Sequence, residues 1–409
     1  MSGSVRQPSE TEFAEPAFMA DPYPTYTCLR DESPVFRIKL PSGLPAWFIS
    51  RYEDARAALA DPRLGKGNVR IGHQNKFPFG DVPMHEHLLH ADPPKHTRLR
   101  KLVARAFVPA RVEGLRPRIH QIAGELLDAI SDRHTVDLIE SFAFPLPLAV
   151  ISELLGISPD QRSEFQRMAI DLVSSPPDTT AEQIREQAVR FERYLRALVA
   201  EKRHRPADDL LSALAGSTDA DEGSLTETEL VSMAFLLLLA GYETTVNLIG
   251  NGVYSLLRHP DQLAALRARP ELIEPAVEEM LRFESPLAFA TLRQATEPVT
   301  YGGVTIPAGE LVVVGLSAAN RDGRHFHDPD GFDVSRDTAG HLAFGHGIHF
   351  CLGATLGRME GQIAIGELLR RYSSIELDAD PADLRWRAGM LIRGLRELPV
   401  RLSRADGVG

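Results

Sequence analysis

The sequence predicts a mainly α-helical protein with a minor β region. Three observations lead to this prediction. Helical periodicity accounts for most of the 409 residues, short strand-like segments are confined to two regions, and 43% of the residues are hydrophobic. That hydrophobic content is enough to bury a large core.

Helices are expected wherever apolar residues recur every three or four positions. The predicted helical segments are Tyr52–Ala60, His96–Phe107, Arg111–Ile130, Pro145–Leu155, Ala181–His204, Thr226–Leu257, Asp261–Arg267, Pro275–Phe283 and Leu356–Tyr372. The longest of them begins with Thr226 and Glu229, the spacing of a capping box.

Strands are expected in two sets. Val35–Leu40 and Ala46–Ser50 flank a turn-rich segment and predict a hairpin. The second set consists of Val299–Tyr301, Val304–Ile306 and Leu311–Leu316.

No long linker or repeat divides the chain, so residues 1–409 are interpreted as one domain with a loose tail over residues 1–20. Two segments, Gly65–His90 and Ser174–Thr180, have weak structure signals. Long loops in a compact domain are often lids or binding loops.

Composition excludes several classes of function. The net charge of -11 argues against general nucleic-acid binding. The polar N-terminus lacks the apolar region of a secretory signal, and the longest apolar run, Met233–Gly241, is shorter than the roughly 20 residues that a membrane span needs. We therefore expect a cytoplasmic protein that binds no membrane. The two cysteines, Cys28 and Cys351, cannot build a disulfide scaffold or a four-cysteine metal site.

The segment Phe344–Gly353 is the most informative in the chain. Gly345 and Gly347 permit turns that other residues avoid, and Gly353 removes a side chain two residues after Cys351. A helical pattern starts at Leu352, so Cys351 is expected at a helix N-terminus, where the helix dipole favours a thiolate. A thiolate on a glycine-rich loop is suited to metal ligation. Cys28, in an ordinary helical stretch, is interpreted as a small buried residue.

Zinc is a second interpretation of this region, because five histidines crowd it. They are His325, His327, His341, His346 and His349. Their spacing fits no compact zinc pattern, so this alternative ranks low.

The long helix contains an unusual segment at Ala240–Thr245. A glycine, an acid and two threonines interrupt a helix that is otherwise apolar nearly all round, and Gly and Thr both weaken helical hydrogen bonding. We expect a local opening here that holds a water molecule or O2. The plainer interpretation is a helix that reaches the surface at Tyr242–Thr245.

These motifs together resemble the cytochrome P-450 superfamily. Phe344–Gly353 is similar to the haem-binding signature of that superfamily, and Ala240–Thr245 is similar to its oxygen-activation motif. The resemblance extends over about Asp21 to Leu402 and is greatest to soluble bacterial, especially actinobacterial, members that oxidise macrolides, other polyketides and sterol-like molecules in secondary metabolism. It implies a triangular, prism-like helical fold with small β-sheets, haem b as cofactor, and Cys351 as the axial ligand of the iron.

The resemblance also assigns roles to other residues. Thr244 would hydrogen-bond the oxygen being activated, and Glu243 would relay protons. Residues that would bind the cofactor, through its propionates or by close approach, are His96, Arg100, Ala240, Gly241, Arg293, Phe344, Gly345, His349 and Gly353. A structural trio is expected from Glu279, Arg282 and Arg336. Apolar substrate contacts are expected from Leu239, Ala288, Phe289 and Leu391.

The function implied is a monooxygenase that inserts one atom of O2 into a bulky, mostly apolar small molecule of macrolide, polyketide, sterol or terpenoid type. A ferredoxin and a ferredoxin reductase would supply the electrons to a monomeric enzyme. Lys95–Arg118 contains eight basic residues and one acid, Glu113, and we expect it to dock an acidic ferredoxin. The alternatives are a peroxide-driven peroxygenase and a non-enzymatic haem sensor or electron carrier.

Overall fold

The computed structural model describes residue 13 and residues 16–40, 42–67, 82–173, 179–387 and 389–404. The chain forms two compact units. The first consists of Met1–Val69, His120–Pro145 and Thr244–Gly409, and the second of Arg70–Ile119 and Leu146–Glu243. The polypeptide crosses between them four times, the last time inside helix α11 (Glu227–Arg258). That the two units act as one domain stays a prediction.

Helices dominate both units. The first unit contains the C-terminal half of α11 and most of α6 (Arg116–Ala129), and its other helices are α1 (Pro16–Ala20), α2 (Tyr23–Glu32), α3 (Tyr52–Ala60), η3 (Ile139–Ala143), α12 (Pro260–Ala268), η4 (Pro270–Leu272), α13 (Ile273–Phe283), α14 (Leu316–Asn320), η5 (Gly347–His349) and α15 (Ala354–Arg371). The second unit contains the N-terminal half of α11, and its other helices are η2 (Leu88–His90), α4 (Lys95–Ala104), α5 (Pro109–Gly114), α7 (Pro145–Leu154), α8 (Pro159–Val173), α9 (Ala181–His204) and α10 (Leu210–Ala215).

The strands form small sheets, most of them in the first unit. The largest has five strands in the order β1 (Val35–Lys39), β2 (Pro45–Ile49), β10 (Leu311–Val314), β7 (Arg293–Ala295) and β3 (Leu64–Gly65). A three-stranded sheet follows the order β11 (Tyr372–Leu377), β12 (Pro399–Arg404) and β4 (Thr135–Asp137). Two hairpins complete the set, β8 (Val299–Tyr301) with β9 (Val304–Ile306) and β5 (Thr218–Asp219) with β6 (Gly223–Ser224). The expected fold class, mainly α with a minor β region, is confirmed.

The three strands of the second predicted set are present as β8, β9 and β10, but they belong to two different sheets. The strand β10 pairs with β2 in parallel and with β7 in antiparallel, whereas β8 and β9 pair with each other. All four residues of β10 are buried, so burial of its apolar side chains beside the first hairpin determines its place.

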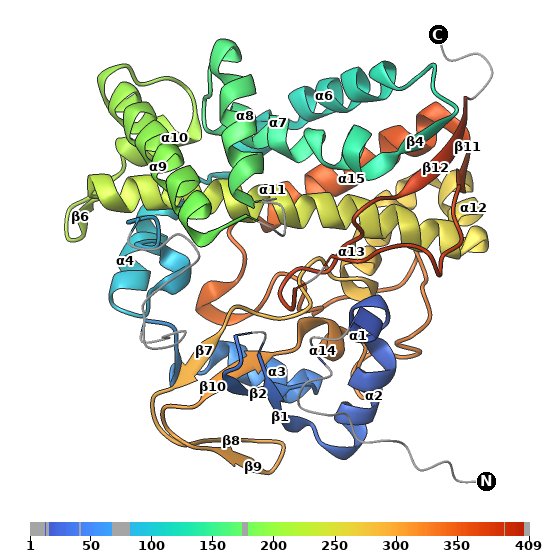
Figure 1. Ribbon diagram of the computed structural model, residues 1–409, viewed down its shortest axis with the longest axis horizontal. Helices are drawn as coiled ribbons and strands as arrows, with labels where there is room; N and C mark the ends of the chain where they lie inside the picture. Colours follow the sequence, from blue (N-terminus) through green and yellow to red (C-terminus); the bar gives the residue numbers. More distant parts are fainter. Residues whose placement is uncertain are drawn as a thin grey trace. The chain divides into compact units, whose positions relative to one another are not determined.

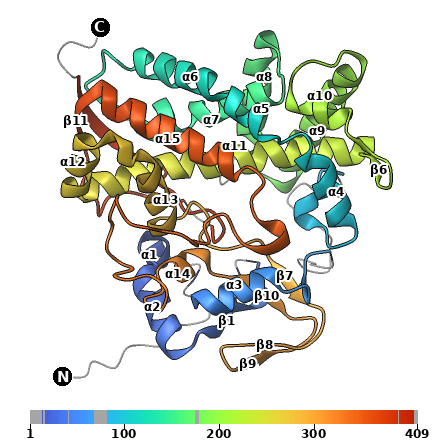
Figure 2. The ribbon, with the colours of Figure 1, turned by 180° about the vertical axis from the view of Figure 1, so that it is seen from behind.

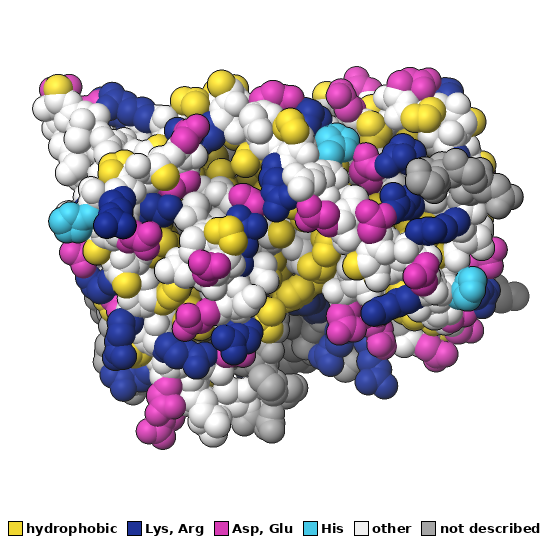
Figure 3. Space-filling view, turned by 90° about the horizontal axis from the view of Figure 1, so that it is seen from above, with side chains coloured by type: hydrophobic (Ala, Val, Ile, Leu, Met, Phe, Trp, Pro, Cys, Tyr) yellow, Lys and Arg dark blue, Asp and Glu magenta, His cyan; other side chains and the backbone are white. Residues whose placement is uncertain are grey.

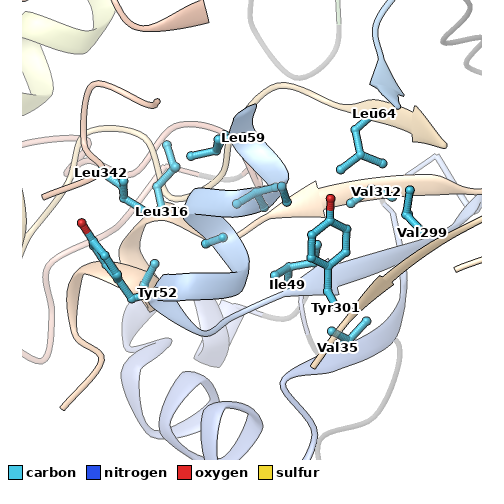
Figure 4. Close-up of a cluster of buried hydrophobic side chains, with 14 of the residues drawn as sticks. Val35, Ile49, Tyr52, Leu59, Leu64, Val299, Tyr301, Val312, Leu316 and Leu342 are labelled. Atoms are coloured by element: carbon cyan, nitrogen blue, oxygen red, sulfur yellow. The ribbon is translucent and has the colours of Figure 1, made fainter. Parts of the chain in front are cut away.

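An apolar core packs α3 against the five-stranded sheet (Figures 1 and 4). Tyr52 and Leu59 of α3 are buried with Ile49 of β2 and Val312 of β10. The same cluster includes Leu342, which lies shortly before the cysteine loop. The loop is therefore anchored to the sheet through this core.

The expected N-terminal tail is corrected at Phe13 and over Pro16–Ala20. Residues Pro16–Ala20 form α1, and the rings of Phe13 and Phe18 are buried. Phe13 packs edge-on against Phe48 of β2 with ring centroids 5.1 Å apart, which explains why this segment is ordered by tertiary contacts that the local sequence does not reveal.

Most predicted helices are confirmed within two or three residues, with one exception. Arg111–Ile130 is two helices, α5 and α6, because the chain turns at Leu115 between them. The weak-structure segments Gly65–His90 and Ser174–Thr180 lie largely outside the described residues, at 68–81 and 174–178.

The helix α11 begins with the predicted capping box. The amide of Thr226 donates to Glu229 Oε2 at 3.0 Å, and the amide of Glu229 donates to Thr226 Oγ1 at 3.1 Å. The helix then continues through Ala240–Thr245 to Arg258, so the expected interruption is absent. Packing outweighs the weak helix propensity there, since Tyr242 and Thr245 are buried.

By length and composition α11 is long and apolar enough to cross a membrane, with a mean hydropathy of 1.4 over its most apolar window. Of that window 67% is buried inside the protein, as in the core helix of a globular fold. In the first unit α15 lies alongside α11 (Figures 1 and 2), and a Cβ on Gly361 of α15 would stand 2.8 Å from Leu248 of α11. The glycine permits this close approach of the two helices.

The expected trio of Glu279, Arg282 and Arg336 meets in the core. Arg282 donates to Glu279 through Nε at 2.6 Å and Nη2 at 2.8 Å, and both side chains are fully buried. Arg336 Nε donates to Glu279 Oε1 at 3.2 Å. Arg282 also donates to the carbonyls of Pro329 and Gly331, at 2.8 and 3.0 Å, so the trio ties α13 to the segment that leads to the cysteine loop.

We expect Glu279→Gln to destabilise the fold by about 3–5 kcal/mol, because it leaves the buried charge of Arg282 uncompensated. Urea unfolding followed by circular dichroism measures the change. The matched control is Glu376→Gln, which breaks the exposed pair of Glu376 with Arg401 and is expected to cost less than about 1 kcal/mol. Equal losses in the two variants would contradict a structural role for the buried trio.

Candidate functional site: the cysteine loop and its surroundings

The cysteine loop is a tight turn that leads into α15. Gly345 and Gly347 have φ angles of 72° and 74°, in the left-handed region that favours glycine. At Gly347 space is also limiting, because a Cβ there would stand 2.8 Å from the carbonyl oxygen of Leu59. The amide of Cys351 donates to the carbonyl of Phe344 at 2.9 Å and closes the loop. Both expected glycine turns are therefore present.

Cys351 is placed to act as a ligand. It is a thiol with an exposed side chain, and it lies three residues before the first residue of the 18-residue helix α15. The positive end of the helix dipole stabilises a thiolate near this position. Beside it, a Cβ added at Gly353 would meet nothing within 4 Å. An exposed thiol beside open space fits a large planar group bound through the sulfur.

A partly buried network of charged and polar side chains on α13 and α15 supports the cysteine loop. Glu278 of α13 accepts hydrogen bonds from Arg358 Nε at 2.6 Å and lies 3.0 Å from His341 Nε2. The guanidinium of Arg358 also lies 4.4 Å from the ring centroid of Phe344, a cation–π contact. The expected cofactor residue Phe344 is thus held in place by Arg358.

Sequence reasoning missed Glu278 and Arg358. Arg358 is seven residues after Cys351 on the predicted helix, which places it near the loop by helical spacing, but a lone arginine on a helix is usually solvated. Glu278 stands next to the predicted Glu279, and nothing local indicates that the two acids have separate partners.

The cationic residues expected to hold the cofactor are divided between the units. In the first unit Arg293 begins β7, is 3% exposed and donates to the carbonyl of Ala58 at 3.5 Å, while His349 ends η5 and is half-buried. In the second unit His96 is buried on α4 and Arg100, one helical turn later, is half-buried. In each unit one member of the pair is thus buried and the other is half-buried.

The middle of α11 has one face that is less covered than the rest. Ala240 is exposed although its neighbours in the chain are mostly buried, and Glu243 and Thr244 are half-buried. Ala240 and Thr244 lie one turn apart on the same face. Gly241 packs closely on α7, where a Cβ would meet Ile151 at 3.4 Å. A small residue on the uncovered face leaves room for a ligand against the helix.

The residues expected to contact a substrate differ in exposure. Leu391 is 40% exposed and Leu239 is half-buried, whereas Ala288 is buried. Phe289 is a correction: its ring is 2% exposed and packs edge-on against Phe48 at 5.5 Å between centroids. The apolar character of Phe289 therefore serves the aromatic core, and its ring offers no exposed surface to a substrate.

The histidines near the loop have other contacts. The ring of His325 stacks on Tyr52 with centroids 3.5 Å apart, and His341 faces Glu278. Within the part of the chain that the structure describes, no group of three or more His, Cys, Asp or Glu side chains is placed to hold a metal ion. The zinc interpretation has no support in these contacts.

Acidic partners reduce the charge of the basic segment Lys95–Arg118. Arg105 and Lys101 both contact Asp219, Arg98 contacts Glu229, and Arg118 Nε donates to Glu153 at 2.9 Å. Arg116 pairs with Glu113 within the segment. Acidic and basic side chains are also interspersed over the face drawn in Figure 3. The positive potential is therefore smaller than the sequence count suggests.

Comparisons with known proteins agree with the resemblance seen in the sequence. The family model described as Cytochrome P-450 matches residues 163–393. Cytochrome P-450 107B1 of Saccharopolyspora erythraea is 52% identical over 394 residues, which cover 94% of this chain and 96% of the relative. 6-Deoxyerythronolide B hydroxylase of the same organism is 44% identical and covers 95% of this chain and 97% of its own length. The solved structure of the tirandamycin C-bound P-450 monooxygenase TamI has a TM-score of 0.85 and 46% identity, and it covers 95% of this chain and 99% of its own.

The network around Glu278 predicts a pH dependence. Burial raises the pKa of Glu278, but hydrogen bonds from His341 and Arg358 outweigh it and lower the pKa from 4.5 to about 2. Between these two pH values Glu278 binds more protons in the unfolded chain than in the folded one. The stabilisation of the fold by the Glu278 carboxylate is therefore complete above about pH 4.5 and is lost as the pH falls toward 2.

We expect Glu278→Gln to lose on the order of 2 kcal/mol of unfolding free energy at neutral pH. The difference from the wild type should shrink as the pH is lowered from about 5 to about 3, measured by urea unfolding at each pH. A difference that is constant across this range would show that the carboxylate charge is not what stabilises the loop.

Proposed function

Because the chain belongs to the cytochrome P-450 family, we propose that Cys351 is the axial ligand of the haem iron in an enzyme that oxidises a bulky, mostly apolar substrate of macrolide or polyketide type. The observation that carries this proposal is the exposed thiol of Cys351 in a glycine loop, beside open space at Gly353 and before α15.

The protein is an oxidoreductase, a haem-dependent cytochrome P-450 monooxygenase with haem b as its cofactor. When bound, thiolate-ligated haem activates O2 and supplies the oxidant for insertion of one oxygen atom into the substrate, a reaction that consumes two electrons and two protons. Around it, the loop residues Phe344, Gly345 and Gly353 would leave room for the ring on the cysteine side. Ala240 would do so on the side of α11, whereas the expectation for Gly241 is corrected, because that residue faces Ile151 of α7.

The propionates of haem need cationic partners, and four basic residues, two buried and two half-buried, fit that need. They are His96, Arg100, Arg293 and His349. The face of α11 that carries Glu243 and Thr244 would deliver protons. The Thr244 hydroxyl would donate a hydrogen bond to the oxygen under activation, and the half-buried Glu243 carboxylate would pass protons from solvent toward it.

The substrate class is inferred from relatives and from apolar side chains. Two of the three relatives named above act on 6-deoxyerythronolide B or bind tirandamycin C, as their names state. In this chain Leu391 is exposed and Leu239 is half-buried, so apolar surface is available to a bulky molecule. Leu391 is the residue for which contact with the substrate is best supported.

Electrons would come from a separate ferredoxin and its reductase, in the cytoplasm. Two observations, one in each unit, support a protein partner. Lys101 and Arg105 remain more than two-fifths exposed although they pair with Asp219. Next to Cys351, the apolar side chains of Ile348 and Phe350 are 49% and 41% exposed, which suits an apolar contact with a protein partner.

The first prediction concerns the iron ligand. The dithionite-reduced protein should show a strongly red-shifted Soret band with carbon monoxide, and Cys351→Ala should lose it because the sulfur ligand is gone. Cys28→Ala is the matched control and should keep the band. In spectra recorded before reduction, 6-deoxyerythronolide B and tirandamycin C should shift the Soret band of the oxidised protein more than myristic acid does. A spectrum typical of histidine ligation in the wild type would overturn the assignment of Cys351.

The second prediction concerns proton delivery. With the compound that gives the largest spectral shift, Thr244→Ala should form product from at most about one-tenth of the electrons consumed, the remainder appearing as hydrogen peroxide. The control is Thr245→Ala, since Thr245 is buried on a different face of α11. If both variants coupled electrons to product as well as the wild type, Thr244 would have no role in proton delivery.

The third prediction concerns the electron donor. Charge reversal at Arg105 and Arg111 should lower ferredoxin-supported turnover several-fold at low salt, with little change at high salt where charges are screened. Asp219→Asn is the control, because it removes the acidic partner of Arg105 and leaves the cations in place. Unchanged turnover at low salt in the double variant would remove this segment from consideration as the docking site.

A further inference from the structure

A buried ion pair joins two residues that have no role in the site described above. Glu284 directly follows α13 and is 6% exposed, and Arg393 lies near the C-terminus and is 4% exposed. The Nε of Arg393 contacts Glu284 Oε1 in a short ion pair. Both residues belong to the first unit.

Each member of the pair has additional partners. The hydroxyl of Tyr23 donates to Glu284 at 2.8 Å, and Arg321 lies 3.7 Å from the other oxygen of the same carboxylate. Arg393 donates to the carbonyl of Met19 at 2.6 Å, and its guanidinium lies 3.8 Å from the ring centroid of Trp386. A buried pair that is satisfied in this way has one well-defined geometry, and replacing either charge leaves the other without compensation.

The backbone around the pair forms a short antiparallel contact. The amide of Arg393 donates to the carbonyl of Pro286 at 2.8 Å, and the amide of Ala288 donates to the carbonyl of Leu391 at 3.0 Å. Between these bonds Leu287 pairs with Ile392. The exposed side chain of Leu391 thus projects from a segment held by two backbone hydrogen bonds and the side chain of Arg393.

The helix α11 adds a further restraint on the segment that carries Arg393. Asn251 Nδ2 donates to the carbonyl of Arg393 at 2.9 Å and lies 3.3 Å from that of Glu284. Gly394 follows directly, and any side chain there would collide with Asn247, since a Cβ would stand 1.7 Å from its Oδ1. The segment therefore has little freedom as long as the Arg393 side chain stays in place.

We propose that Glu284 and Arg393 are positioning residues that hold Leu391 in the wall of the substrate pocket and so determine how tightly a bulky apolar ligand is bound. This inference rests on the proposed function in one respect, the contact of Leu391 with the substrate. Leu391 is 40% exposed and has little packing of its own, so its position follows from its neighbours, of which Arg393 is the one anchored by a buried charge.

The test compares two probes that bind the haem iron through the same imidazole nitrogen. Imidazole is too small to reach beyond the iron, whereas clotrimazole carries three aromatic rings and contacts the surrounding wall. Difference spectra of the holoenzyme should give an imidazole Kd within about twofold of the wild type in Glu284→Gln and Arg393→Lys. The Kd of clotrimazole should rise about tenfold, and Leu391→Ala should reproduce that rise without touching the ion pair.

A second readout does not depend on haem chemistry. Hydrogen exchange in peptides that contain the amides of Ala288 and Arg393 should be at least about tenfold faster in both ion-pair variants, because the backbone contact loses its anchor. The matched control is Asp209→Asn, which breaks another buried pair, with Lys202 at 2.6 Å, and should leave both azole affinities unchanged.

Two outcomes would overturn the proposal. One is wild-type clotrimazole binding in the ion-pair variants, which would make the pair merely structural. The other is an equal loss of imidazole and clotrimazole binding, which would place the effect at the haem itself. Failure of the proposed function is distinguishable, because the wild type would then show neither the carbon monoxide band nor an imidazole spectrum, and hydrogen exchange would still report on the anchor.

Discussion

A carboxylate that loses its hydration on folding needs partners that compensate for the loss, and three such carboxylates, two of them buried and one half-buried, lie along α13 and at its end. Glu279 is fully buried and is compensated by Arg282 and Arg336. Glu278 faces His341 and Arg358, and Glu284 meets Arg393. Each acid therefore binds a different part of the chain, and the positions of those parts depend on α13.

Each of the three networks holds a different segment of the proposed site in place. The Glu279 network holds the segment before the cysteine loop through the carbonyls of Pro329 and Gly331. The Glu278 network holds Phe344 through Arg358, next to Cys351. The Glu284 network holds the segment that carries Leu391. The loop that carries the proposed iron ligand and the segment that carries the proposed substrate contact are thus anchored on the same helix within the first unit.

Packing against α11 completes this arrangement. Gly361 lets α15 approach Leu248, and Asn251 binds the carbonyl of Arg393. The same helix carries Glu243 and Thr244, so the residues proposed for proton delivery share a rigid element with the contacts that hold the cysteine helix and the C-terminal segment. A site on such an element can keep the hydroxyl of Thr244 fixed against the group it serves.

The sequence by itself determined the class of the protein, because the features that carry it are local. The glycines around Cys351, the capping box of Thr226 and Glu229, and most helix boundaries depend on neighbours within a few residues, and each can be deduced from spacing. What the tertiary structure decided depends on contacts between distant residues. It placed β10 beside the first hairpin, ordered Phe13 against Phe48, turned Phe289 into the core and kept α11 continuous at Gly241. It also gave the adjacent acids Glu278 and Glu279 different partners, because two neighbouring side chains on a helix point in directions about 100° apart, and only the surrounding fold determines what each one meets.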